Sequence, residues 1–101
     1  MKVYVVVNHY MNGLEAEAVF SSMDNAQQYI TNRKKGGSPE VIGQDVHGEM
    51  ELPNQVFSAS CYHRDSDLHI YKELHDTFEA ADRAAGVDGL VLPMIIDEKL
   101  G

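Results

Sequence analysis

The histidines and the single cysteine of this 101-residue chain are the side chains best able to bind a metal or to catalyse a reaction. Cys61 and His63 lie two positions apart in a segment typical of a strand, so their side chains share one face. Structural zinc prefers such ligands. However, Phe57 and Leu68 are expected on the same face, and no second cysteine or H-x-x-x-H spacing completes a site. We interpret this face as core and expect neither metal nor cofactor.

A second candidate is a pair of histidines in equivalent places. When the two halves of the chain are aligned, His9 falls on His63, near a hairpin end in each half. If the rings converge, His9, Cys61 and His63 form a ligand site between the halves, and the contact responds to pH because histidine titrates near about pH 6.5. The alternative, which we favour, is two histidines at the rim of the core, each hydrogen-bonded locally.

Other catalytic signatures are missing from the sequence. There is no G-x-S-x-G motif, and Gly36-Gly37-Ser38 follows a predicted helix, whereas the glycines of a phosphate loop lead into one. Asp45, His47, Glu49 and Glu51 alternate along one strand and could hold a divalent cation, but such a row is typical of the solvated face of an antiparallel strand. We therefore predict that the chain is not an enzyme.

Tyrosines and acids alternate on the faces of the hairpins that we expect to point outward. Tyrosine is enriched among the residues that dominate protein interfaces, so these faces indicate a binding surface for another protein. The predicted surface comprises Tyr4, Asn8, Tyr10, Glu15, Glu17, Tyr62, His69 and Tyr71. The same residues lie under the helices if the two faces of the sheet are assigned the wrong way round.

A hairpin is the first element that must position these side chains. The segment from Lys2 to Met11 is rich in valine and tyrosine, as strands are, and Asn12-Gly13 is a strong signal for a two-residue turn. The return strand runs from Leu14 to Phe20. This turn predicts four pairs: Met11 with Leu14, His9 with Ala16, Val7 with Ala18, and Val5 with Phe20. The face with Val3, Val5 and Val7 is expected to be core.

A helix and a third strand complete the first half. Ser21 is the expected N-cap, the apolar stripe contains Met23, Ala26 and Ile30, and Gly36-Gly37 ends the helix. Alternation from Val41 to Leu52 predicts the third strand.

The second half shows the same order. It contains a strand at Val56–His63, a strand at Leu68–Leu74, a helix capped by Asp76, and a last strand at Gly89–Asp97. The four-residue turn between the first two strands pairs His63 with Leu68 and Cys61 with Ile70.

We interpret the chain as a single α+β domain, residues 1–101, made of two tandem diverged β-β-α-β units at about 2–52 and about 55–98. In this interpretation the antiparallel hairpins carry the two helices on one side. The alternative is that two similar local motifs arose separately.

The hairpin and helix of the first half also resemble a known group of domains. With Val19-Phe20-Ser21-Ser22 and Ala26 leading into the helix, about residues 3–30 are similar to small uncharacterised domains encoded by phages and bacterial mobile elements. In the second half Leu74-His75-Asp76-Thr77 replaces the Phe-Ser-Ser stretch. The resemblance implies a phage or mobile-element origin and transfers no catalytic motif.

Charge and hydropathy exclude several classes of partner. Sixteen acids against eight bases give a net charge of −8, which opposes direct binding to nucleic acid or to an anionic membrane surface. No apolar run approaches the roughly 20 residues of a membrane span, and the apolar stretch Val3–Val7 is too short for a signal peptide. One cysteine cannot form an internal disulfide. We therefore predict a cytoplasmic protein.

We predict a non-catalytic acidic module that binds or inhibits another protein, for example as a phage or mobile-element accessory protein acting on a host protein. One alternative is a small-molecule or metal-binding protein, or an enzyme, with its site between the halves. Another is a structural homo-oligomer, such as a homodimer, formed through open sheet edges, although Pro93 opposes pairing along the last strand.

Overall fold

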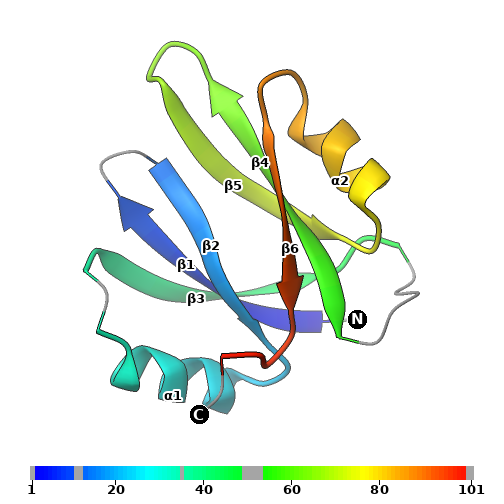
Figure 1. Ribbon diagram of the computed structural model, residues 1–101. Coiled ribbons are helices and arrows are strands. Elements are labelled where there is room, and N and C mark those ends of the chain that lie inside the picture. Colours follow the sequence, from blue (N-terminus) through cyan, green and yellow to red (C-terminus); the bar gives the residue numbers. More distant parts are fainter. Residues whose placement is uncertain (1, 11–12, 35, 49–53, 100–101) are drawn as a thin grey trace.

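The structure is a computed structural model that describes residues 2–10, 13–34, 36–48 and 54–99 (Figure 1). It is a mixed α+β fold with one six-stranded sheet and two helices. The elements are β1 (Lys2–Tyr10), β2 (Gly13–Phe20), α1 (Met23–Asn32), β3 (Ser38–Asp45), β4 (Gln55–His63), β5 (Leu68–His75), α2 (Phe78–Ala85) and β6 (Leu90–Ile95).

The strands follow the order β3-β1-β2-β5-β4-β6, so each half of the chain supplies three adjacent strands. Pairing within each half is antiparallel. The halves meet where β2 and β5 run parallel, through the pairs Gly13–His69 and Leu14–Ile70. Gly13 has a φ of 131°, and a Cβ there would lie 2.1 Å from the His69 carbonyl oxygen. Only glycine fits this junction without displacing backbone.

The inner face of the sheet is covered because the two halves pack against each other, and the helices cover the outer face. The largest core cluster combines Val3, Val5 and Val7 of β1 with Val56 and Leu74 from the second half. The opposite face of β1 and β2 lies under α1, and the outer face of β4 lies under α2. Both helices therefore lie on the outer face of the one curved sheet, α1 over the first half and α2 over the second, and they flank the central core from opposite ends of the molecule, as Figure 1 shows.

Each half also fastens its last strand onto the other half. The His47 amide donates to the Leu74 carbonyl at 3.0 Å, and the Asp97 amide donates to the Val19 carbonyl at 2.9 Å. Val46 and Ile96, which precede these residues, are buried in the central core. The sheet is thus wrapped around its core and held at both ends.

The first hairpin has a different register from the predicted one. The observed pairs include His9–Leu14, Val7–Ala16 and Val6–Ala18, so Glu17 is an extra, bulged residue on β2. The predicted pairs of His9 with Ala16, Val7 with Ala18 and Val5 with Phe20 are wrong. The predicted partner of Leu14 and the first residue of the Asn12-Gly13 turn lie outside the described residues. In the second hairpin, the predicted pairs His63–Leu68 and Cys61–Ile70 are confirmed.

The helices begin one residue later than predicted. Ser22, rather than Ser21, caps α1 by accepting a hydrogen bond from the Asn25 amide, and Thr77, rather than Asp76, caps α2 through the Ala80 amide. The third strand, predicted from Val41 to Leu52, is observed at Ser38–Asp45, and residues 49–53 lie outside the described part. No helix among the described residues is long and apolar enough to cross a membrane.

Candidate functional site

A groove lies between the two halves of the described chain. It encloses a volume of about 450 Å³. We call it the interhalf groove, and its walls are Tyr10, Gly13, Leu14, Glu15, Ala16, Ser58, Ser60, His69, Leu90 and Leu92. A second cavity of about 280 Å³ extends it along β2 and β6 and shares Glu15, Ala16 and Leu92 with it.

The groove exists because β2 contacts the second half near its two ends. At its start β2 pairs with β5 through Gly13 and Leu14, and at its end the Val19 carbonyl accepts from Asp97. Between these points β2 faces β6 without pairing with it, which leaves the edges of two strands exposed to the same space. The site is therefore a consequence of how the halves pack.

The walls of the groove are mostly apolar, with a few polar groups. Leu90 and Leu92 of the edge strand β6 are 44 % and 40 % exposed, and Tyr10 is 40 % exposed. The Ser58 hydroxyl donates to the Leu92 carbonyl at 3.4 Å. His69 Nε2 lies 3.1 Å from the Asp88 carbonyl; because a carbonyl only accepts, Nε2 is the donor. A neutral His69 ring therefore keeps Nδ1 as an acceptor.

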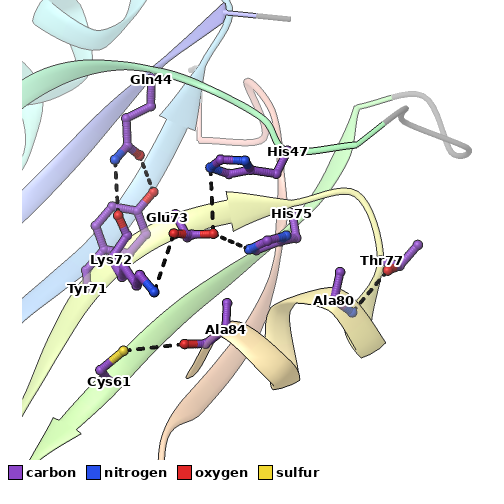
Figure 2. Close-up of polar contacts among 10 residues, drawn as sticks. All are labelled: Gln44, His47, Cys61, Tyr71, Lys72, Glu73, His75, Thr77, Ala80 and Ala84. Carbon is purple, nitrogen blue, oxygen red and sulfur yellow. Dashed lines mark hydrogen bonds and ion pairs between the residues drawn. The ribbon is translucent and has the colours of Figure 1, made fainter. Parts of the chain in front are cut away.

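The corresponding space between β3 and β5 is closed by polar side chains (Figure 2). Gln44 of β3 donates through Nε2 to the Lys72 carbonyl at 3.3 Å, and its Oε1 accepts from the Tyr71 hydroxyl. Tyr71 is buried, and burial together with the nearby Glu73 carboxylate raises its pKa. Gln44 thus bridges two strands that lack a ladder between them.

Two histidines and a glutamate lie beside this bridge, where the end of β3 meets β5 (Figure 2). His75 Nε2 is 2.5 Å from Glu73 Oε2, and His47 Nε2 is 3.6 Å from the same oxygen. The two imidazole rings stack with their centroids 5.0 Å apart. Among the described residues, no group of three or more histidine, cysteine or acidic side chains could hold a metal ion. The contacts of His47 with Glu73 and His75 join the chain at the end of β3 to β5.

A buried ion pair lies under α1. Glu17 accepts hydrogen bonds from Arg33 at 2.6 and 2.7 Å, from the Tyr29 hydroxyl at 2.5 Å and from Asn8 at 3.1 Å. Burial by itself raises the pKa of Glu17, but the bonds from Arg33, Tyr29 and Asn8 and the charge of Arg33 outweigh it and lower the pKa to about 2. Burial and the Glu17 carboxylate raise the pKa of Tyr29 to about 12. These groups hold α1 on the sheet.

The predicted protein-binding surface is not one exposed face. Tyr10, Glu15 and His69 line the interhalf groove, and the Tyr62 ring packs against His69 at a tilt of 45°, with ring centroids 5.1 Å apart. Asn8 and Glu17 are buried. Tyr4 packs against the core cluster under α1, and Tyr71 belongs to the central core. The structure thus brings four of these residues together and covers the other four.

The predicted ligand site of His9, Cys61 and His63 is not assembled as one cluster. His9 pairs with Glu40 of β3 at 2.8 Å on the exposed surface. The Cys61 thiol donates to the Ala84 carbonyl of α2 at 3.5 Å, and His63 is exposed at the hairpin end. Of the predicted acidic row, His47 faces Glu73, Asp45 is exposed, and Glu49 and Glu51 lie outside the described residues.

The sequence did not indicate Ser58, Leu90 or Leu92 as residues of a site. Leu90 and Leu92 alternate with Val91 and Pro93, which indicated a strand but did not show which of its edges stays open. Pro93 indicates that this strand lies at an edge of the sheet, because proline in a sheet is confined to edge strands and bulges.

The geometry defines a small α+β domain with an apolar groove between two halves. A family model described as a domain of unknown function (DUF7336) matches residues 1–58, which is more than half of the chain. The chain therefore belongs to this family. No curated protein and no solved structure matches it.

Proposed function

We propose that the chain is a non-catalytic binding domain whose interhalf groove takes a small, largely apolar molecule. The observation that carries this proposal is the groove itself, with about 450 Å³ of volume, apolar walls and a few polar groups. Ligand pockets have volumes of roughly 300–1,000 Å³ and combine apolar walls with a small number of orienting polar groups. Ser60 and His69 supply such groups here.

The edge of β6 is poorly suited to the alternative of an added peptide strand. Asp97, two residues beyond β6, directs its amide toward β2, whereas Ile96 directs its amide toward Asn54 beside β4. Because successive residues of a strand direct their backbone groups to opposite sides, Pro93 points its nitrogen toward the groove. Proline has no N–H to donate, so the middle of this edge cannot continue a ladder.

A second candidate function is binding to another protein, as the sequence predicts. It is supported by the exposure of Tyr10, Leu90 and Leu92 around one concavity, since anchor side chains in protein interfaces are often accommodated in such pockets. In this case the groove takes an apolar side chain of the partner.

A fragment screen read by amide chemical shifts of the ¹⁵N-labelled protein tests the first candidate. We expect several neutral one- or two-ring fragments to shift the amides of Leu14, Ala16 and Leu92 at millimolar concentration. Leu92→Lys should remove these shifts, whereas Val87→Lys, at a position that is 85 % exposed and outside both cavities, should not. If no fragment in a library of several hundred shifts these amides, the proposal is wrong.

We also propose that the two halves are diverged copies of one β-β-α-β unit. When β2 and α1 are aligned with β5 and α2 by a shift of 55 residues, the bulged residues Glu17 and Lys72 coincide (72 − 17 = 55), as do the helix caps Ser22 and Thr77 (77 − 22 = 55). The hydrogen bonds that fasten β3 and β6 end on Leu74 and Val19, which also coincide. If the halves are copies, the space between β3 and β5 is equivalent to the space between β6 and β2. Gln44 closes the first space, and Met94, which aligns with Gln44, leaves the second space open.

A further inference from the structure

We infer that the molecule bound in the interhalf groove is an organic cation, an amine with an apolar body, rather than a carboxylate. This inference rests on the proposed function and adds the charge of the ligand to it. It is carried by three features of the groove: an unpaired carboxylate at its rim, an exposed aromatic ring, and a histidine that presents an acceptor.

Glu15 is the carboxylate. It is exposed and lines both cavities. The walls of the larger cavity include no lysine or arginine, and those of the smaller one include Lys99 together with Glu98 and Glu17. Three other glutamates of the described chain have partners: Glu17 pairs with Arg33, Glu40 with His9, and Glu73 with His75. Glu79 and Glu98 have no side-chain partner among the described residues, and neither lines the larger cavity. Glu15 has neither a salt bridge nor a side-chain hydrogen bond within the described residues. An amine at the rim would supply its counter-charge.

The charge of the whole chain acts in the same direction. The net charge of −8 attracts cations and repels anions over distances of about a Debye length. A carboxylate ligand would therefore meet an unfavourable potential before reaching the groove, and it would then face Glu15 without a cation in the wall of the larger cavity.

Tyr10 and His69 provide uncharged contacts to the amine. An ammonium group over an exposed tyrosine ring is attracted by the negative face of the ring, and this chain already places Lys2 Nζ 5.8 Å from the centre of the Tyr4 ring. His69 donates from Nε2 to the Asp88 carbonyl, so its neutral ring offers an acceptor for an N–H of the ligand. Leu14 and Leu92 would contact the apolar body.

Three indole compounds that differ in charge test the inference: tryptamine, 3-methylindole and indole-3-propionate. Each is titrated into the full chain at pH 7 and low salt, and binding is followed by the amide shifts of Leu14, Ala16 and Leu92. We expect tryptamine to bind about tenfold more tightly than indole-3-propionate, with 3-methylindole between them. In Glu15→Gln this ratio should fall to about threefold or less. Glu79→Gln, an exposed change on α2, should leave the ratio unchanged.

Each other outcome overturns the inference in a recognisable way. If indole-3-propionate binds as tightly as tryptamine, or if Glu15→Gln leaves the ratio unchanged, Glu15 does not select a cation. If 3-methylindole binds to the groove in that case, the proposed function, binding of a small apolar molecule, is not contradicted. If none of the three compounds shifts the groove amides, the inference fails, and the fragment library then decides whether the groove binds small molecules at all.

Discussion

At the scale of single residues, Glu17 is the group whose ionisation most directly affects stability. Its pKa is lowered to about 2 in the folded chain from an ordinary value of 4.5. A lowered folded pKa stabilises the native state above the unfolded pKa, and this stabilisation is lost as the pH falls toward the folded pKa. The native chain should therefore lose about 2–3 kcal/mol of unfolding free energy between pH 5 and about pH 2 through this group alone.

The measurement is urea denaturation of the native chain and of Glu17→Gln from pH 7 to pH 2. We expect the two free energies to differ most at pH 7 and to converge as the pH falls. Glu98→Gln, an exposed change, should stay within about 0.5 kcal/mol of the native chain at pH 7. A constant difference between the native chain and Glu17→Gln over this range would show that the ion pair with Arg33 does not respond to pH as described.

Gly13 gives a second prediction at this scale. Gly13→Ala places a Cβ 2.1 Å from the His69 carbonyl oxygen and also carries the strain of a positive φ. Gly86→Ala carries only the strain, since nothing lies within 4 Å of its Cβ. We expect a loss of about 1 kcal/mol for Gly86→Ala and at least about 3 kcal/mol for Gly13→Ala, measured by thermal unfolding. Equal losses of unfolding free energy would mean that the backbone at the β2–β5 junction moves to accommodate the Cβ at little cost.

At the scale of elements, mutations of the two observed helix caps test how much each cap stabilises its helix. Ser22→Ala and Thr77→Ala each remove the side-chain acceptor of a helix N-terminus and should cost about 1 kcal/mol. Ser22→Asp, which keeps an acceptor, should restore most of the loss. Denaturant midpoints provide the measurement, and a neutral Ser22→Ala would show that α1 is held by its packing on the sheet.

The elements themselves were largely predictable, because strands and helices leave periodic patterns in a short stretch of sequence. The second hairpin was placed in its correct register by its turn. The first hairpin was not, because Tyr10 pairs with Gly13 and His9 with Leu14, so the register already differs from the predicted one on the turn side of the bulge. The bulge at Glu17 then shifts the pairs beyond it by one residue. The cap positions were missed by one residue, since Ser21 and Ser22 are both good caps. Ser21 instead donates to Asp97.

At the scale of the molecule, the packing of one half on the other was beyond prediction. Alternation showed that Val3, Val5 and Val7 are buried but not that they meet Val56 and Leu74. Tyr10, Glu15 and His69 were identified as surface residues without the groove that joins them. Long-range packing of this kind depends on the shape of both sheets, which a local pattern does not encode.

The shared core predicts that neither half folds alone. Fragments 1–50 and 51–101 should each lack a cooperative thermal transition, because each would expose the valines and leucine that the other half covers. An equimolar mixture should regain the transition and the amide spectrum of the intact chain. A cooperative transition in either fragment by itself would show that the central core is not required.

The fastening of β6 also determines when the chain can fold during synthesis. Ile96 fills the central core, and the amide of Asp97 joins β2, an element that is synthesised well before β6. A nascent chain therefore cannot complete this core until residue 97 has left the ribosomal exit tunnel. Until then the hairpin of β1 and β2 has its inner face exposed, and its valines are a surface that chaperones can recognise.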